Sequence, residues 1–247
     1  MDSITIAGFG MMASRLASRQ KQQTLQKPDP LIICILGAPG VGKGTQSSLL
    51  ASRLSLTHLS WGDLSRAEHK IPGSVISKYP LKPGREDSPD VPDDVAASEV
   101  RKNLEMRTRD VSKRIWLVDG FPRRSGHWLE WWKQLPPPSL VLHLHCDKSI
   151  SLKRVNQRSA TSGRRDDQNP DTVVNRIDKF AQGHDGILPA IRKLGLNVAS
   201  VNTDNKDVER VYMDVLSHIK PVIEKYELEN QFPSAESSFE FWPMAWC

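Results

Sequence analysis

Residues 35–45 read ILGAPGVGKGT, a glycine-rich stretch that carries a single lysine, Lys43. Its glycines are Gly37, Gly40, Gly42 and Gly44. Glycine lets backbone N–H groups turn inward toward a phosphate, whereas a side chain at such positions would block the approach. Lys43 adds a full positive charge for the β- and γ-phosphates of a nucleotide. An apolar run precedes the stretch and a helical pattern follows it. The sequence therefore predicts a phosphate-binding loop rather than a turn that only joins a strand to a helix.

The residue after Lys43 departs from the usual pattern of such loops. That pattern places serine or threonine directly after the lysine, where the hydroxyl ligates Mg²⁺. Here Gly44 takes that position, and Thr45 follows one residue later. The loop predicts nucleotide binding but leaves open how a metal ion is held.

Short apolar runs alternate with stretches of helical spacing along the chain. The apolar runs are residues 31–36, 114–121, 140–146 and 196–202. Helical patterns cover residues 43–55, 93–107, 171–182, 187–194 and 206–219. Runs that are apolar on both faces suit buried parallel strands. The alternation predicts an α/β fold, with helices on both faces of a parallel sheet.

The composition limits the class of protein. The chain has 247 residues, the size of one α/β domain, and 38% of them are hydrophobic, which suffices for a core. No run of about 18 apolar residues occurs, so we expect no membrane-spanning helix. The three scattered cysteines form no disulfide framework and favour a reducing compartment. Cys34 and Cys146 lie in apolar runs and are expected to be small core residues.

The chain is basic, with a formal net charge of +5 and a pI of about 9.1. Binding to nucleic acid, a solvated surface with a basic tail, and phosphates held in a cleft would each explain this charge. The positions of the arginines, given below, favour phosphates in a cleft. We therefore expect no nucleic-acid partner.

Both ends of the chain differ in composition from its middle. Residues 1–30 are basic and small polar residues with few acids. We expect a disordered lead-in there, with a mitochondrial presequence as the alternative. Residues 221–247 are expected to form a C-terminal tail, which from residue 228 mixes acids with aromatic residues. This tail is either a strap over an apolar groove or disordered.

Four motifs occur in an order that resembles the nucleoside monophosphate kinases, the family of the adenylate and UMP/CMP kinases. They are GAPGVGKGTQ at 37–46, HLSWGDLSR at 58–66, LVDGFPR at 117–123 and KRVNQRSATSGRRDD at 153–167, the last followed by Arg176. In that family glycine after the lysine is normal, and the metal is held mostly through waters and nucleotide phosphates. The similarity covers about residues 31–220. It implies a P-loop three-layer sandwich with a five-stranded parallel sheet, and phosphoryl transfer from ATP to a nucleoside monophosphate.

That reaction needs several arginines and no strong general base. The attacking phosphate oxygen is already largely ionised near neutral pH, because its second pKa is about 6. The remaining task is to hold two polyanions in line, and guanidinium groups suit it. By the resemblance, Arg66 and Arg123 hold the acceptor's α-phosphate, Arg154 and Arg158 contact the donor phosphates, and Arg164 and Arg176 converge on the transferred group. The expected catalytic set is Lys43, Arg123, Arg154, Arg164 and Arg176. ATP is expected on the four loop glycines, Lys43, Thr45, Arg154 and Arg158.

The resemblance also assigns roles to three acids. Asp119 matches the acid that orients the waters around Mg²⁺, and Asp166 and Asp167 match lid acids that position neighbouring arginines. The lid, residues 154–167, has no room for the small domain of long-lid adenylate kinases, so we expect no structural zinc. We expect ATP as co-substrate, Mg²⁺ as cofactor and a monomer. The expected location is the cytoplasm, with the nucleus and mitochondrion as alternatives.

Fewer residues bear on the identity of the acceptor. Trp61, Gly120 and His127 are expected to line its site together with Arg66 and Arg123. At the position of Trp61, adenylate kinases usually have Thr and UMP/CMP kinases Ala. At the position of His127, adenylate kinases usually have Gln, which reads adenine, and UMP/CMP kinases Asn. Trp131 matches a tryptophan typical of UMP/CMP kinases, which favours UMP or CMP over AMP. The alternative for Trp128, Trp131 and Trp132 is packing of a helix on the sheet.

The acceptor-binding insert, residues 60–92, departs from the family after Arg66. Extra prolines and acids fill residues 80–92, and Gly84 and the pair Val91–Pro92 are candidate remnants of the family's acceptor-binding turn. Low activity, an unusual acceptor and a non-catalytic relative that acts as a regulator stay open. So does a kinase for a hydroxyl-bearing small molecule. Retention of Lys43 and of all six arginines argues against the non-catalytic relative and against the small-molecule kinase.

Overall fold

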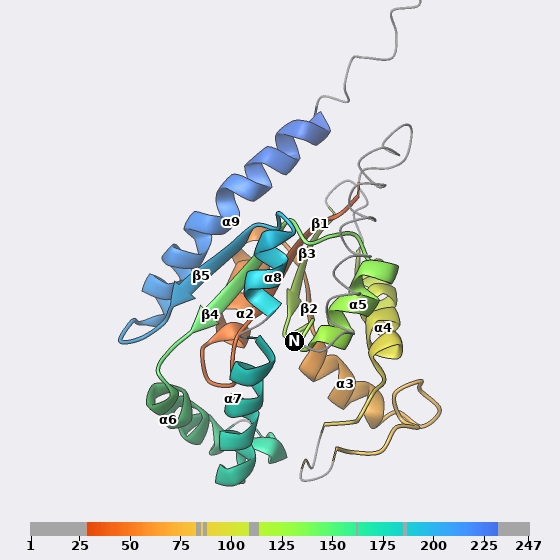
Figure 1. Ribbon diagram of the computed structural model, residues 1–247, viewed down its shortest axis with the longest axis vertical. Helices are drawn as coiled ribbons and strands as arrows, with labels where there is room; N and C mark the ends of the chain where they lie inside the picture. The colour runs from red at the N-terminus through yellow and green to blue at the C-terminus, as the bar shows by residue number, and fades with distance from the viewer. Residues whose placement is uncertain are drawn as a thin grey trace, which may run out of the picture.

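The computed structural model describes residues 29–82, 85, 88–108, 114–161, 163–184 and 187–231. It confirms the α/β fold and the five-stranded parallel sheet. The strands lie in the order β2-β3-β1-β4-β5 (Figure 1). Their bounds are β1 Leu31–Leu36, β2 Thr57–Ser60, β3 Ile115–Asp119, β4 Leu140–His145 and β5 Val198–Asn202.

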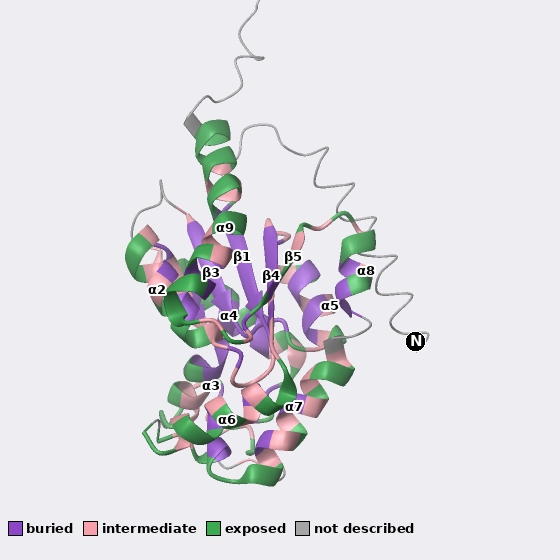
Figure 2. Ribbon diagram, turned by 90° about the vertical axis from the view of Figure 1, so that its left-hand side faces the viewer, coloured by how far each residue is buried: buried purple, intermediate pink, exposed green. Residues whose placement is uncertain are grey.

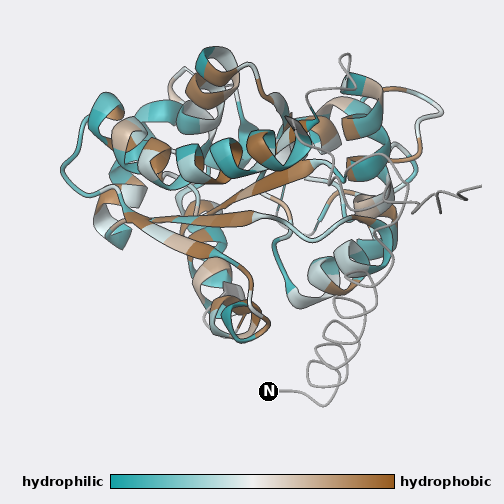
Figure 3. Cartoon of the chain, turned by 90° about the horizontal axis from the view of Figure 1, so that it is seen from above, coloured by the Kyte–Doolittle hydropathy of each residue, from teal (hydrophilic) through white to brown (hydrophobic). Residues whose placement is uncertain are grey.

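Strand β1 lies at the centre of the sheet. Every one of its residues is buried, because β3 and β4 flank it and helices cover both of its faces. Alternate residues serve different layers: Ile32 and Cys34 belong to one hydrophobic cluster, and Ile33 and Ile35 to the other. Figure 2 shows this buried centre, and Figure 3 shows the hydrophobic strands between two layers of helices.

Helices of different connections cover the two faces. On one face, α2 (Lys43–Leu54) and α9 (Val208–Gln231) pack on the cluster that contains Ile33. On the other face lie α4 (Asp93–Arg107), α5 (Ser125–Gln134) and α8 (Ile187–Lys193). Helix α2 follows β1 and helix α5 follows β3. The chain therefore leaves these two neighbouring strands toward opposite faces of the sheet. A crevice between the loops at the carboxyl ends of such strands is the usual ligand site of this sheet type.

The remaining helices lie beyond the carboxyl ends of the strands (Figures 1 and 2). They are α3 (Trp61–His69), α6 (Lys148–Ser159), the 3₁₀ turn η1 (Arg165–Asp167) and α7 (Pro170–His184). Val155 of α6 packs with Val173 and Ile177 of α7 in a small cluster of their own. These elements frame the end of the sheet where the phosphate-loop motif lies.

Several expectations about the elements need correction. Helices α3, α5 and α6 lie outside the predicted helical patterns. Strand β2 was not predicted, because it has four residues of which only Leu59 is buried, too short for a clear pattern. Helix α9 does not stop near residue 219 but passes Pro221 and continues to Gln231, into the expected tail. Val222, Ile223 and Tyr226 pack on the sheet cluster, and this packing holds the helix together beyond the proline.

Several other predictions lie partly or wholly outside the described residues. They concern residues 1–28 of the lead-in, residues 232–247 of the tail, and Gly84. Of the cysteines, Cys34 is buried in the core and Cys146 is half-buried, and both are free thiols. No helix in the described part of the chain combines the length and apolarity needed to cross a bilayer.

Candidate active site

A cleft of about 1300 Å³ opens at the carboxyl ends of the strands. Loops after β1, β3 and β5 line it, together with α3, α6 and α7. All sequence-predicted site residues lie on its walls: Gly37, Gly40, Gly42, Lys43, Gly44, Thr45, Trp61, Arg66, Asp119, Gly120, Arg123, His127, Arg154, Arg158, Arg164 and Arg176. Segments far apart in the sequence therefore meet around one space.

The glycine-rich loop is held close to the neighbouring backbone. Gly40 has φ +86°, and a Cβ at this position would overlap the carbonyl oxygen of Ser151 on α6. The Ser151 hydroxyl donates a hydrogen bond to the carbonyl of Pro39. Only glycine fits this approach, so the loop is fixed against α6. Ser151 thus helps to hold the glycine-rich loop, although it lies outside the loop motif.

Lys43 lies inside this loop at the start of α2. Its Nζ donates to the carbonyl oxygens of Gly37 at 2.7 Å and Ala38 at 2.9 Å. Burial lowers the pKa of Lys43 from 10.5 to about 8, and the charge of Asp119 opposes that shift only in part. The lysine is thus a cation whose charge is costly to keep until a negative group comes near.

Two arginines meet on the side of the cleft formed by β3 and α3. A Cβ on Gly62 would lie 3.1 Å from an Nη atom of Arg123 and 3.4 Å from one of Arg66. Arg123 also donates from Nε to the carbonyl of Gly120, and Arg66 pairs with Asp63. Desolvation inside the cleft and nearby arginines lower the pKa of Arg123 to about 10, although the residue is exposed to the open cleft, so it stays charged at neutral pH. Sequence reasoning had not singled out Gly62, whose missing side chain makes room for both guanidinium groups.

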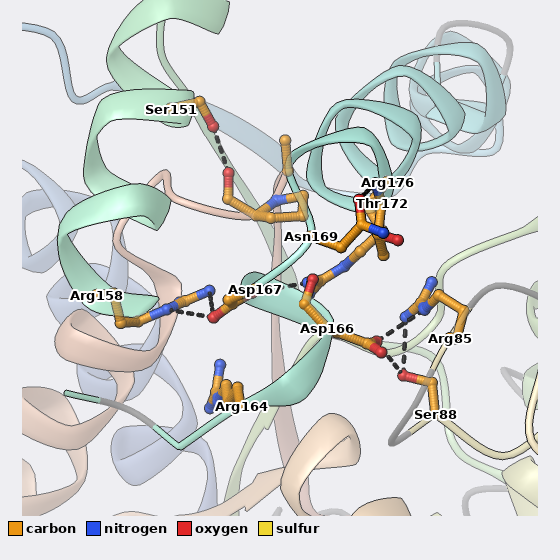
Figure 4. Close-up of polar contacts among 12 residues, drawn as sticks. Arg85, Ser88, Ser151, Arg158, Arg164, Asp166, Asp167, Asn169, Thr172 and Arg176 are labelled. Atoms are coloured by element: carbon orange, nitrogen blue, oxygen red, sulfur yellow. Dashed lines mark hydrogen bonds and ion pairs between the residues drawn. The ribbon is translucent and has the colours of Figure 1, made fainter. Parts of the chain in front are cut away.

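The lid side of the cleft is organised by one carboxylate. Asp167 accepts hydrogen bonds from Nε of Arg158 at 2.9 Å and from an Nη of Arg176 at 2.7 Å (Figure 4). Arg164 reaches across the cleft to Asp63 of α3 at 2.9 Å. Arg154 points differently, since its guanidinium donates to the hydroxyl and carbonyl of Thr203 after β5.

Among the described residues, the lining of the cleft includes twelve Lys and Arg side chains but only three Asp. This excess far exceeds the net charge of +5 for the whole chain. A site with this balance attracts polyanions.

Comparison with known proteins agrees with this geometry. The family profile described as Adenylate kinase matches residues 35–231. The chain is 32% identical to the UMP-CMP kinase of Homo sapiens over 195 residues, which covers 76% of this chain and 95% of the relative. It is 33% identical to the UMP-CMP kinase of Gallus gallus over the same shares, and 34% identical to Adenylate kinase isoenzyme 1 of Gallus gallus over 76% of this chain and 93% of that protein.

The chain belongs to the nucleoside monophosphate kinase family. It is an ATP-dependent nucleoside monophosphate kinase, and the cleft is where its sheet and lid bring the charged motifs together.

Two predicted acceptor-site residues of the kinase have contacts that the sequence did not suggest. His127 is 4% exposed; its Nδ1 accepts the backbone N–H of Arg123 at 3.1 Å. Its Nε2 lies 3.2 Å from Asp93, so the neutral ring carries its proton there and donates it. Burial is the main reason that the pKa of His127 falls to about 4, so the ring is neutral near pH 7. Both nitrogens are engaged within the protein.

Trp61 packs with its ring 5.7 Å from that of Phe121, and only 6% of the residue is exposed. The three tryptophans of α5, Trp128, Trp131 and Trp132, are all buried in the same layer of the core. Trp131 donates to the carbonyl of Pro136 and does not line the cleft. Its match to UMP/CMP kinases therefore reflects packing, not contact with an acceptor base.

Asp119 is the carboxylate of the kinase that fits a metal ion best. It ends β3, is 7% exposed and lines the cleft beside the loop that carries Lys43. Within the described part of the chain its carboxylate has no hydrogen-bond or ion-pair partner. No group of three or more His, Cys, Asp or Glu able to hold a metal was found among the described residues. One buried acid with unused oxygens suits a hydrated Mg²⁺ held through water.

Proposed function

We propose that this kinase transfers the γ-phosphoryl group of ATP to UMP or CMP in preference to AMP. The observation that carries the proposal is the cluster of Trp61, Phe121 and His127 at the acceptor end of the cleft. The Phe121 and His127 rings lie 4.5 Å apart, and the Trp61 ring lies 5.7 Å from that of Phe121. His127 has no ring nitrogen left to read adenine, and the indole occupies space where adenylate kinases usually have threonine. A smaller pyrimidine suits this end better than a purine.

The relatives support the same acceptor. The human and chicken proteins that match 95% of their own length are named UMP-CMP kinase. An adenylate kinase matches at 34% identity, so identity alone does not separate the two acceptors.

ATP is proposed to lie with its phosphates on the glycine-rich loop. The loop N–H groups and Lys43 face the triphosphate, and Arg158 and Arg176 approach from the lid. The acceptor phosphate is proposed to bind Arg66 and Arg123, whose guanidinium groups meet over Gly62. The two nucleotides then face each other across the cleft.

In this arrangement the acceptor's phosphate oxygen attacks the γ-phosphorus in line, and the bond to the β-bridging oxygen breaks. The oxygen needs no base near neutral pH. Charge spreads over the moving group, and the proposed contacts from Lys43, Arg164 and Arg176 stabilise it. Arg154, bonded to Thr203, is proposed to reach the phosphates after the lid moves. The lid would also exclude water, which would otherwise accept the phosphoryl group.

Mg²⁺ is the proposed cofactor, with Asp119 as its protein partner through water. When bound it neutralises charge on the β- and γ-phosphates. Because one chain lines both sides of the cleft, a monomer suffices for the reaction. The free thiols Cys34 and Cys146 fit a reducing compartment such as the cytoplasm.

The acceptor is tested by steady-state rates of ADP formation with UMP, CMP and AMP. We expect kcat/KM for UMP or CMP to exceed that for AMP at least tenfold. In Trp61→Thr this preference should shrink. A higher kcat/KM for AMP in the unaltered protein would overturn the acceptor assignment while leaving the family assignment intact.

A further inference from the structure

Arg85 is a cleft arginine that no family motif covers. It lies in the segment 80–92, where the sequence departs most from the family, and it lines the same cleft as Arg123. Its Nε donates to Oδ2 of Asp166 at 2.8 Å, and an Nη donates to the Ser88 hydroxyl at 2.9 Å. Ser88 in turn donates to the same Asp166 oxygen at 2.6 Å (Figure 4). The three side chains form a closed hydrogen-bonded ring between the acceptor segment and the lid.

Asp166 depends on these partners because it is nearly buried. Only 3% of the residue is exposed. Burial by itself would raise the pKa of Asp166, but the Ser88 hydrogen bond and the charges of Arg85 and Arg176 lower it to about 2. The carboxylate is therefore ionised at neutral pH. Loss of a partner leaves a buried charge poorly compensated, which is costly.

The turn that carries Asp166 also carries the acid that orients the lid arginines. Both acids belong to η1, a turn of three residues. Asp167 holds Arg158 and Arg176, and Arg176 also donates to the backbone carbonyl of Asp166 at 3.2 Å. A displacement of Asp166 is thus passed directly to Arg176. Figure 4 shows this chain of contacts running from Arg85 through η1 to Arg158.

We propose that Arg85, together with Ser88, is a positioning residue: through Asp166 it fixes η1 and thereby aims Arg158 and Arg176 at the transferred phosphoryl group. The segment 80–92 and the lid arginines Arg158 and Arg176 are then coupled, so that a movement of one changes the position of the other. Filling the acceptor side helps to order the side that contacts ATP. This rests on the proposed placement of the acceptor at Arg66 and Arg123.

The first test is Arg85→Ala, measured by kcat and by the Kd of ATP alone. We expect kcat to fall tenfold or more, because Arg158 and Arg176 lose their orientation. The Kd of ATP should change less than threefold, since the glycine-rich loop stays intact. Arg85→Lys should recover only part of the loss, because an ammonium cannot bond Asp166 and Ser88 with the same fork. The matched control is Arg53→Ala, which removes a two-pronged Arg–Glu209 pair outside the cleft and should leave kcat unchanged.

The second test is a double-mutant cycle between Arg85→Ala and Asp166→Asn. If Arg85 acts through Asp166, the double variant loses no more activity than the worse single variant. Losses that multiply would overturn the proposal, as would an Arg85→Ala protein with unchanged kcat. Ser88→Ala, which removes one hydroxyl and no charge, provides a milder third member and should lose activity two- to fivefold. Thermal unfolding of each variant shows whether it is folded.

A binding measurement separates this proposal from the proposed acceptor. The probe is a bisubstrate analogue in which adenosine and uridine are joined through five phosphates. In the unaltered protein the analogue should bind more tightly than ATP. In Arg85→Ala the ratio of the Kd of ATP to the Kd of the analogue, which measures this advantage, should fall at least tenfold. If UMP and CMP are not phosphorylated, the acceptor assignment fails. The same binding comparison, made with an analogue that joins two adenosines through five phosphates, then decides the role of Arg85. An unchanged advantage in Arg85→Ala with both analogues would refute it.

Discussion

At the residue scale, the site depends on cations placed where burial opposes their charge. Lys43 is the clearest case, because burial lowers its pKa to about 8. Its positive charge is therefore present below that pH and lost as the pH rises through it. The phosphates of ATP favour the charged form and raise the pKa again on binding.

This predicts that ATP affinity falls at alkaline pH. Between pH 7.5 and 9.5 we expect the Kd of ATP to rise about twentyfold, because binding must then protonate Lys43. Titration calorimetry in buffers of different ionisation enthalpy should detect the proton taken up. In Lys43→Arg the charge is permanent, so the Kd should vary little over this range. An identical pH dependence in both proteins would contradict the assigned role of Lys43.

Gly62 allows a second prediction at this scale. A methyl group there would press on the guanidinium groups of Arg66 and Arg123, which can shift without disturbing the backbone. Alanine is also a better helix former than glycine by roughly 1 kcal/mol. Gly62→Ala should therefore keep or raise Tm while increasing the KM for the monophosphate at least fivefold.

The control for Gly62→Ala is Gly183→Ala in α7, where the added methyl meets only ordinary contacts. It should gain similar stability without a change in KM. If Gly62→Ala leaves the KM for the monophosphate unaltered, the two arginines do not hold the acceptor phosphate.

At the element scale, α4 and α5 are joined beside the cleft by a partly exposed polar contact that includes the buried His127. Asp93 at the start of α4 bonds to Arg124 and to His127 of α5. The pKa of His127 is lowered from 6.5 to about 4, chiefly by burial. The unfolded chain thus takes up a proton at a higher pH than the folded one. The stability due to the neutral ring is complete above about pH 6.5 and is lost as the pH falls toward 4.

Unfolding in urea should show this loss. From pH 7 to pH 4.5 we expect His127 to account for a decrease of about 2–3 kcal/mol in the free energy of unfolding. His127→Gln removes the titrating ring, so its curve should be flatter over this range by that amount. Asp93, whose pKa is lowered to about 2, titrates below the window and does not confuse the comparison. Parallel curves for the two proteins would show that His127 is not kept neutral by the fold.

The elements also show where sequence reasoning reaches its limit. Strand β1 and helix α4 have the predicted bounds, because an apolar run and a regular spacing define them. Strand β2 has neither signal, and its residues were interpreted only as part of a binding motif. The end of α9 depends on tertiary packing beyond Pro221, which no local pattern expresses.

At the scale of the whole molecule, the sequence located the cleft residues well because they lie in ordered motifs. The contacts made by residues outside the motifs could not be predicted. Arg85 contacts Asp166, which lies 81 positions later in the chain. Arg85 belongs to the segment 80–92, which matches none of the family motifs. The engagement of both nitrogens of His127 depends on Asp93, which lies 34 positions earlier on another helix.

The central claim about the whole molecule is that one cleft holds two facing nucleotides in line. Titration calorimetry with the adenosine–uridine pentaphosphate analogue tests it most directly. We predict one analogue per chain, bound at least tenfold more tightly than ATP and displaced by either ATP or UMP. Binding no tighter than that of ATP, with UMP still able to bind to the filled protein, would contradict the claim.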